Sequence, residues 1–355
     1  MIHAELKQRK GQFQLDARFA VPANGVVGLF GASGSGKTSV LRALAGLEPD
    51  VKGEIRFGEQ VWLNSERARS TAERGIGYVF QEPTLFPHLT VKGNLDYATK
   101  RRNLARQSID LDRLIELLEL QPLLNRDTRS LSGGERQRTA IGRALATNPA
   151  LLLLDEPLSA LDQDARQKVM FVLENVFQNL EIPAFYVSHS SDEIARLADS
   201  LIVMDAGQVS ACGALTQVLG QVDGQWHESE AAFSVLHCRI LAHDLPYLSR
   251  LVSAGGEALL VARQSLNPGD PLRLRIQARD VSLCLEKPAN SSILNILPAT
   301  VKAISKQVEQ GSRTVGLDLA GESLLARVSE HSVQQLRLTP GSPVFAQIKS
   351  VALLS

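Results

Sequence analysis

The sequence predicts an α/β fold with a largely parallel sheet, followed by a small all-β domain with an OB-like barrel. In the first half, short apolar runs alternate with helical patterns, as strands and crossover helices do in parallel sheets. A glycine-rich loop joins one of these runs to a helical pattern. The last part alternates apolar and polar residues between Pro-Gly turns, which is typical of small antiparallel barrels.

Four apolar runs predict the strands of the parallel sheet. They read GVVGLF, ALLLLD, AFYVSH and SLIVMD, at residues 25–30, 150–155, 184–189 and 200–205. Apolar residues recur at three- and four-residue intervals over 109–120, which predicts an amphipathic helix. The composition changes after residue 206, so we expect a first domain over 1–225, a linker with the first β segments over 226–290, and the barrel over 291–355.

Length and charge limit the possible functions. A chain of 355 residues is longer than the chains that usually fold around a single hydrophobic core, so we expect more than one domain. Lys plus Arg and Asp plus Glu both number 38, so the formal net charge is zero. No net electrostatic attraction therefore draws the chain to nucleic acid or anionic lipid. No apolar run approaches the roughly 18 residues of a membrane-spanning helix, and the N-terminus has no signal-peptide core. Cys212, Cys238 and Cys284 form no CxxC pair. We therefore expect a cytoplasmic chain with reduced thiols.

The loop after the first predicted strand matches G-x-x-x-x-G-K-[ST]. Its glycines let backbone N–H groups approach phosphate oxygens, and the following helix adds the positive end of its dipole. The lysine neutralises phosphate charge and the threonine hydroxyl can ligate Mg²⁺. We therefore expect ATP to bind at Gly31, Ala32, Ser33, Gly34, Ser35, Gly36, Lys37, Thr38 and Ser39.

Two acidic residues end the apolar run LLLLDEP. A strand buried on both faces opens at its carboxyl end onto the ligand crevice of an α/β sheet. Asp155 is expected to hold Mg²⁺, and Glu156 to act as the general base for the attacking water. His189 ends another run and is expected to contact the γ-phosphate.

A third motif lies between these elements. In LSGGERQR, residues 131–138, Ser132, Gly133 and Gly134 at a helix start offer a second anion site. This stretch resembles the signature of the ATP-binding-cassette (ABC) ATPases, a branch of the P-loop NTPases, and the resemblance covers residues 1–225. It implies a homodimer in which Ser132, Gly133, Gly134 and Glu135 face the ATP of the other copy.

Other positions carry over from the same resemblance. Gln81 matches the glutamine that reaches Mg²⁺ and the attacking water, and His189 matches the switch histidine. Ser159 and Asp162, in SALD, match the loop that crosses the dimer interface. Phe13 is the candidate for stacking on adenine, although its spacing to the loop is shorter than the family's.

The resemblance implies a membrane partner. Residues 82–140 are expected to form a helical subdomain, and 82–98, directly after Gln81, match the region that receives a coupling helix from the permease. Two permease subunits are the expected membrane partners. The chain would then lie on the cytoplasmic face of the bacterial inner membrane. A loop packed only on its own subdomain is the alternative for this segment.

The finer likeness concerns the cargo. Residues 78–97, 151–162 and 185–199 look most like the ATPase subunits of bacterial molybdate importers, and 291–355 look like their TOBE/Mop barrel. That likeness implies a periplasmic or extracellular molybdate-binding protein as an indirect partner. Such barrels bind oxyanion between paired copies, at positions matching Ser292, Ser329, Lys349 and Ser350. Leu294 stands where a basic residue is common, so a barrel that serves dimerisation alone is the alternative to oxyanion binding.

Two other functions stay open from the sequence. The same ATPase can serve another cargo, such as tungstate, sulfate, ferric iron, a polyamine or a sugar. Soluble relatives act on DNA or ribosomes, but they usually fuse two cassettes or split one with a long coiled coil. This chain has one cassette and no sustained heptads, so we expect no nucleic-acid partner.

Overall fold

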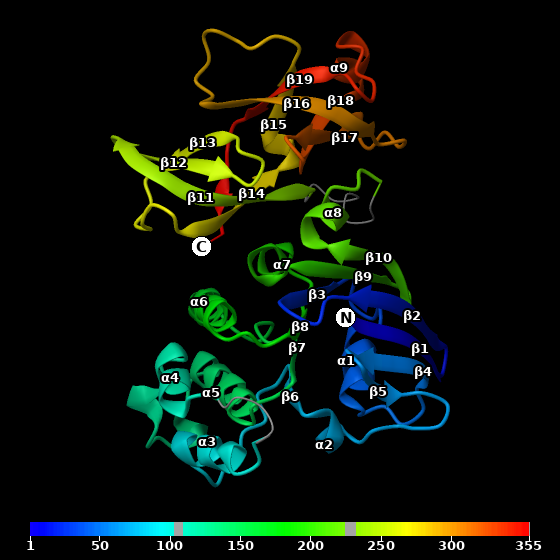
Figure 1. Ribbon diagram of the computed structural model, residues 1–355, viewed down its shortest axis with the longest axis vertical. Helices are drawn as coiled ribbons and strands as arrows, with labels where there is room; N and C mark the ends of the chain where they lie inside the picture. The colour runs from blue at the N-terminus through cyan, green and yellow to red at the C-terminus, as the bar shows by residue number, and fades with distance from the viewer. Residues whose placement is uncertain (103–108, 224–231, 355) are drawn as a thin grey trace. The chain divides into compact units, whose positions relative to one another are not determined.

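The computed structural model describes residues 1–102, 109–223 and 232–354. The chain divides into two compact units, Met1–Gly213 and Ala214–Ser355 (Figure 1). The predicted boundary at residue 225 lies outside the described residues. No helix in the described part of the chain is long and apolar enough to cross a membrane.

The first unit is built on a ten-stranded sheet with the order β5-β4-β1-β2-β10-β9-β3-β8-β7-β6. Its strands are β1 (Ile2–Lys10), β2 (Phe13–Val21), β3 (Val26–Phe30), β4 (Lys52–Phe57), β5 (Gln60–Leu63), β6 (Ile76–Val79), β7 (Leu151–Asp155), β8 (Ala184–Val187), β9 (Ser200–Asp205) and β10 (Gln208–Ala214). The four predicted strands are confirmed as β3, β7, β8 and β9.

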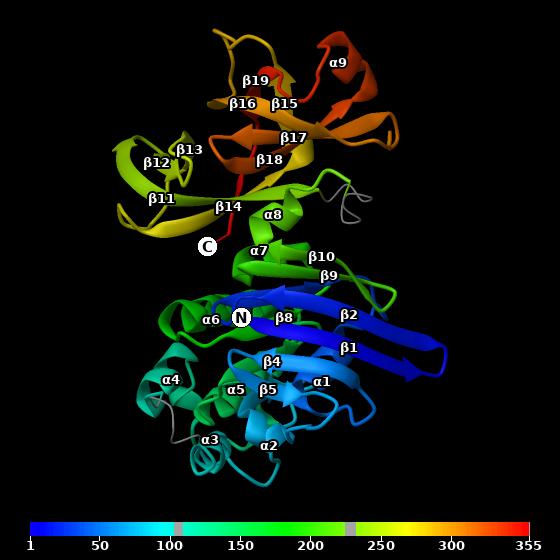
Figure 2. The ribbon, with the colours of Figure 1, turned by 45° about the vertical axis from the view of Figure 1, so that its right-hand side comes forward.

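Parallel pairing brings the carboxyl ends of several strands to one edge of this sheet. β3 pairs in parallel with β8 and β9, and β7 pairs in parallel with β6 and β8. All five residues of β7 are buried, as expected of a strand covered on both faces. In contrast, β1 pairs antiparallel with β2 and β4, and Figure 2 shows these strands side by side.

The helices of the first unit fall into two groups. Those between or beside the strands are α1 (Lys37–Ala45), α2 (Thr71–Arg74), α6 (Gln163–Asn179) and α7 (Ser191–Leu197). The others form a helical segment of α3 (Val91–Thr99), α4 (Leu111–Leu117), η1 (Gln121–Leu123), η2 (Thr128–Ser130) and α5 (Gly133–Ala146). The helix predicted over 109–120 is thus confirmed as α4, with a shorter extent. The predicted helical subdomain, 82–140, also contains 103–108, which lie outside the described residues.

The core of this unit is formed where the helix after the glycine loop meets the sheet. Val40, Leu41 and Leu44 of α1 are fully buried in one cluster with residues of β3, β7 and β8. Because α1 is anchored in this cluster, its N-terminus is held at the carboxyl end of β3. Tertiary packing therefore fixes the position of the glycine loop.

The second unit is mostly antiparallel β structure. It comprises α8 (Leu215–Leu219), β11 (Phe233–Leu245), β12 (Leu248–Ser253), β13 (Ala258–Ala262), β14 (Pro271–Gln277), η4 (Ala278–Asp280), β15 (Val281–Cys284), β16 (Asn295–Ile304), β17 (Ser312–Leu319), β18 (Glu322–Ser329), α9 (Glu330–Gln335), β19 (Pro343–Ile348) and β20 (Ala352–Leu353). The predicted fold class, an α/β domain followed by a small β barrel domain, is confirmed.

The two sheets of this unit have the same arrangement of strands. Their orders are β13-β12-β11-β14-β20 and β18-β17-β16-β19-β15, and every described pair is antiparallel. The short strand that follows each set of four joins the other sheet: β15 pairs with β19, and β20 with β14. One buried cluster contains side chains from both sheets. The two halves are therefore joined by exchanged strands and a common core.

Candidate functional site

The glycine loop turns tightly at the carboxyl end of β3. Gly31 has φ 153°, and a Cβ there would lie 2.2 Å from the carbonyl oxygen of Met204, so a side chain does not fit. Gly34 has φ 80°, and no heavy atom lies within 4 Å of the place of its Cβ. Glycine at these positions brings the backbone close to the sheet and leaves room above the loop. These are the requirements of a phosphate cradle.

Lys37 places its charge across this loop. Its Nζ donates to the carbonyl oxygens of Gly31 and Ala32, both at 2.9 Å, and the residue is 4% exposed. Burial lowers the pKa of the ammonium group, and the carboxylates of Glu156 and Asp155 oppose that shift. The lysine is thus held by the loop that is expected to bind the phosphates, whose charge it would neutralise.

Ser35 supplies a further polar group inside the loop. Its backbone N–H donates to Ala32 O at 3.1 Å, and its carbonyl accepts from the N–H of Gly207 at 3.0 Å. Among the described residues, its buried Oγ has no hydrogen-bond partner. Such a hydroxyl at a phosphate-type loop fits an incoming anion.

Asp155, at the end of β7, joins the loop helix to the sheet. Its Oδ1 accepts from Thr38 Oγ1 and its Oδ2 from the hydroxyl of Tyr78, each at 3.0 Å. Burial raises the pKa of this carboxyl group, while both hydrogen bonds favour its charged form. A hydroxyl and a carboxylate in contact offer hard oxygen ligands, which fit Mg²⁺.

Tyr78 is a member of this site that sequence reasoning missed. It lies on β6, opposite Leu153 of β7. Burial beside Asp155 raises the pKa of its hydroxyl, which stays a proton donor. The one signal in the sequence was a tyrosine three residues before Gln81, in a stretch that was not among the four predicted strands. Nothing local showed that its hydroxyl would reach Asp155.

Glu156 and His189 meet at the ends of β7 and β8. His189 Nδ1 lies 3.5 Å from Glu156 Oε2. Glu156 has φ 45°, a left-handed conformation that is uncommon outside glycine. The turn is held by its N–H, which donates to Val187 O at 3.2 Å, and by Ser159 Oγ, which donates to Glu156 O at 2.9 Å. The structure therefore brings two predicted catalytic residues together.

Other predicted residues lie at the boundaries of elements. Gln81 is exposed and follows β6, the sheet neighbour of β7. Asp162 caps the N-terminus of α6 by accepting from Ala165 N at 2.9 Å. A Cβ on Gly36 would lie 2.9 Å from Phe13 Cζ, so the aromatic ring lies against the glycine loop. Stacking of Phe13 on adenine stays a prediction.

The signature residues form the N-terminus of α5. Ser132 Oγ accepts from Glu135 N at 3.3 Å, and Glu135 Oε2 accepts from Ser132 N at 2.7 Å, which makes a capping box. Gly133 and Gly134 fill the first helical turn. A Cβ on Gly134 would lie 3.3 Å from Ala165 Cβ, so this glycine lets α5 approach α6 closely. The helix start presents backbone N–H groups, as expected of an anion site.

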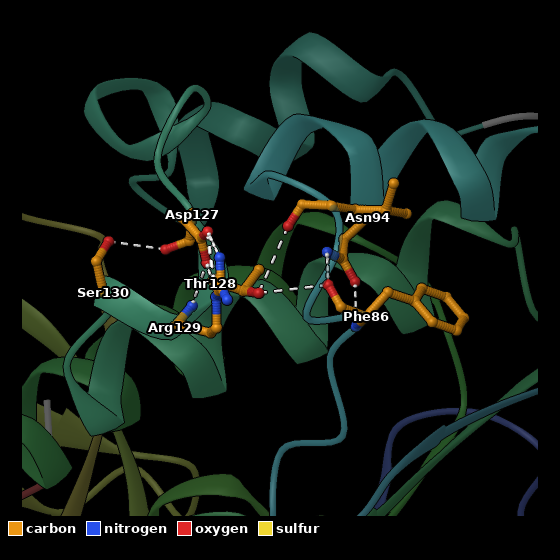
Figure 3. A network of polar contacts seen from close by, with 7 residues as sticks. Phe86, Asn94, Asp127, Thr128, Arg129 and Ser130 are labelled. Atoms are coloured by element: carbon orange, nitrogen blue, oxygen red, sulfur yellow. Dashed lines mark hydrogen bonds and ion pairs between the residues drawn. The ribbon is translucent and has the colours of Figure 1, made fainter.

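The segment after Gln81 is tied to the helical segment by a buried amide, Asn94 on α3. Its Oδ1 accepts from Phe86 N at 2.9 Å, and its Nδ2 donates to Phe86 O and Thr90 O at 3.2 and 3.0 Å. Thr128 Oγ1 donates to the same Phe86 carbonyl at 3.3 Å (Figure 3). The Phe86 ring packs against Tyr97 at 4.5 Å, and the guanidinium of Arg143, on α5, lies 4.8 Å from its centroid. This segment, residues 82–98, is thereby linked to the signature helix; we call it the docking segment.

The four predicted oxyanion residues are not gathered at one place within the chain. Asn295 pairs with Ile348, so Ser292, Lys349 and Ser350 lie near one end of the β16–β19 pair. Ser329 pairs with Ser312, beyond the opposite end of β16, and caps α9 by accepting from Ser332 N at 3.0 Å. The resemblance placed this site between two copies, so it stays a prediction.

Comparisons with known proteins bear on both units. A family model described as "ABC transporter" matches residues 15–159, and one described as "TOBE domain" matches 291–354. The "Molybdenum import ATP-binding protein ModC" of Hahella chejuensis is 45% identical over 353 residues, which cover 99% of both chains. The protein of the same name from Aromatoleum aromaticum is 44% identical over 344 residues, 96% of this chain and 91% of the relative.

A solved structure is also similar. It is the dimer of the ATP-binding cassette MJ0796 in a post-hydrolysis state, bound to ADP and Pi. The TM-score is 0.50 at 26% identity, over 61% of this chain and 99% of that one.

Proposed function

This chain belongs to the ABC transporter family, among its ModC relatives, and we propose that it is the ATPase subunit that couples ATP hydrolysis to molybdate import. The observation that carries the proposal is the likeness to ModC proteins over 99% of the chain, which includes the β domain as well as the ATPase. The assembly of loop, acidic strand end and histidine supports hydrolysis as the activity.

The glycine loop binds the triphosphate of ATP in this proposal. Backbone N–H groups of residues 31–39 surround the phosphates, and the Lys37 ammonium group neutralises their charge. Thr38 and Asp155 would hold Mg²⁺, with Gln81, at the end of β6, as a further ligand. Bound there, Mg²⁺ would neutralise charge on the phosphate oxygens.

Hydrolysis depends on the pair at the strand ends. The Glu156 carboxylate takes a proton from the attacking water, and His189, whose Nδ1 lies 3.5 Å from Glu156 Oε2, contacts the γ-phosphate. Since Asp155 and Glu156 leave the same strand consecutively, one turn positions both the metal ligand and the base. The hydrogen bond from Ser159 to Glu156 O ties this turn to the loop expected at the dimer interface.

The active form in this proposal is a homodimer. Ser132, Gly133, Gly134 and Glu135 of one copy contact the ATP held by the glycine loop of the other, and Ser159 and Asp162 cross between them. The dimeric state of the similar ATP-binding cassette supports this arrangement.

The docking segment receives the membrane partner. Two permease subunits hold the homodimer at the cytoplasmic face of the inner membrane, and an external molybdate-binding protein acts through the permease. The cation–π contact between Phe86 and Arg143 supports this proposal, because it connects the docking segment to the signature helix.

Two measurements test the function. Uptake of labelled molybdate should disappear in cells that lack this gene and return with the native gene, whereas sulfate uptake should not change. Uptake of molybdate that persists without the gene would contradict the cargo. In the purified complex, Glu156→Gln should bind ATP, form a stable dimer and hydrolyse ATP orders of magnitude more slowly, as expected when a general base is removed.

A further inference from the structure

A buried carboxylate lies beneath the turn that carries His189. Glu193 Oε2 accepts from the hydroxyl of Tyr186 at 2.8 Å and from Ser188 Oγ at 2.7 Å. The three side chains are buried, and Glu193 is 7% exposed. Removing a carboxylate from water is costly, and an apolar side chain of similar volume would fill the same space. The acid at this position therefore needs an explanation beyond packing.

The hydrogen bonds of Glu193 fix the backbone on both sides of His189. Ser188 Oγ accepts from Ser190 N at 3.0 Å, and Ser190 Oγ accepts from Glu193 N at 3.4 Å. A hydroxyl has one proton. Ser188 Oγ therefore donates its one proton to Glu193 and accepts from the N–H of Ser190 with a lone pair. The carboxylate thus sets the orientation of the serine hydroxyl and, through it, the turn.

Within the described residues, the Glu156 carboxylate is the one polar group found close to the His189 side chain. That side chain is 64% exposed, and its ring lies 3.5 Å from Glu156 Oε2, longer than a hydrogen bond. The backbone before it is tied to the sheet, because Ser188 N donates to Leu29 O at 3.3 Å and Val187 O accepts from Glu156 N at 3.2 Å. The direction of the imidazole thus follows from the conformation of residues 188–190.

We propose that Glu193 is a positioning residue that fixes the 188–190 turn and thereby aims the imidazole of His189 at the reacting phosphate. The inference rests on the proposed function, since it needs the catalytic role of His189. Glu193 itself touches neither ATP nor Glu156 in this account. It acts through the hydroxyl of Ser188.

The test measures steady-state ATP hydrolysis, ATP affinity and thermal unfolding of the purified full-length chain. Glu193→Leu should lower kcat on the order of tenfold to a hundredfold, the usual effect of a misplaced catalytic group, with ATP affinity unchanged. Glu193→Gln keeps an acceptor oxygen for both hydroxyls, so it should restore kcat to near the native value. Tyr186→Phe, the matched control, leaves the Ser188–Glu193 bond in place and should hydrolyse ATP at the native rate.

A double variant separates positioning from general stability. In a His189→Ala background, Glu193→Leu should lower kcat no further, because the group that it positions is gone. Native kcat in Glu193→Leu, or an equal loss in both backgrounds, would overturn the inference. If Glu193→Leu does not fold, Ser188→Ala gives the same comparison with a smaller change. Native kcat in His189→Ala alone would instead refute the proposed role of the histidine, which is a separate failure.

Discussion

At the scale of the residue, Asp155 has two hydroxyl partners rather than one. Thr38 lies in the loop motif, whereas Tyr78 comes from another strand and has no motif of its own. A partner that holds a metal ligand affects the metal as well, because it fixes the direction of the carboxylate. Tyr78 is thus predicted to support Mg²⁺ binding indirectly.

Tyr78→Phe tests that prediction. Removing the hydroxyl leaves Asp155 Oδ2 without this donor. The affinity for the divalent ion should then fall roughly tenfold, in the range found for partners of metal ligands. Titration of Mn²⁺ into the ATP-bound protein, followed by electron paramagnetic resonance, measures this directly. Phe80→Leu is the control, since the Phe80 ring lies 4.3 Å from that of Tyr78 but contributes no hydroxyl. Equal Mn²⁺ affinity in Tyr78→Phe and the native protein would contradict the prediction.

At the scale of the element, the docking segment depends on one amide. Asn94→Leu leaves the backbone N–H of Phe86 without its partner, Asn94 Oδ1, which costs about 1–3 kcal/mol when such a group stays unsatisfied. The carbonyl oxygens of Phe86 and Thr90 keep Thr128 Oγ1 and the backbone N–H of residue 94 as donors. The free energy of unfolding should fall by about that amount or more, and the permease should stimulate ATP hydrolysis less. Urea unfolding and ATPase assays of the reconstituted complex measure the two effects. Glu116→Ala, at an exposed position of α4 outside the docking segment, should change neither.

The start of α5 predicts a pH dependence. The hydrogen bond from Ser132 N lowers the pKa of Glu135, so this carboxyl group stabilises the fold when it is charged. The stabilisation is complete above the unfolded pKa of about 4.3 and is lost as the pH falls through the lower folded value. Glu135→Gln keeps the cap without the charge. At neutral pH, the native protein should therefore have a higher urea midpoint of unfolding than Glu135→Gln. This difference between the two midpoints should vanish in acid. A constant difference across this range would argue against a charge effect.

At the scale of the whole molecule, the second unit has exchanged strands. β20 completes the sheet of β11–β14, although in sequence it follows the strands of the other sheet. Val351 and Leu353 pack against the shared cluster. Deleting residues 351–355 should therefore cost roughly 2–3 kcal/mol of unfolding free energy and loosen both sheets.

Hydrogen exchange with urea unfolding measures that effect. Faster exchange in β16–β19 as well as β11–β14 is the expected result, because the two sheets have a common core. Ala352→Ser keeps the pairing at an exposed position and should leave the exchange rates unchanged. Faster exchange confined to β14 would mean that the sheets are independent.

The sequence by itself determined the features that are local in the chain. The glycine loop, the acidic strand end and the α5 cap each depend on neighbours within a few residues, because φ, capping and strand periodicity are local properties. The four parallel strands followed from continuous apolar runs, and the fold class followed from the alternation of these runs with helical patterns.

Only the tertiary structure decided which distant groups meet. The Tyr78–Asp155 bond, the 3.5 Å approach of His189 to Glu156 and the exchange of β15 and β20 join residues far apart in sequence. Pairing order and side-chain direction depend on how the whole chain packs, and no spacing along one stretch encodes them. Tyr186, Ser188 and Glu193 are close in sequence, yet the strand and the helix that carry them had to be placed before one carboxylate could accept from both hydroxyls.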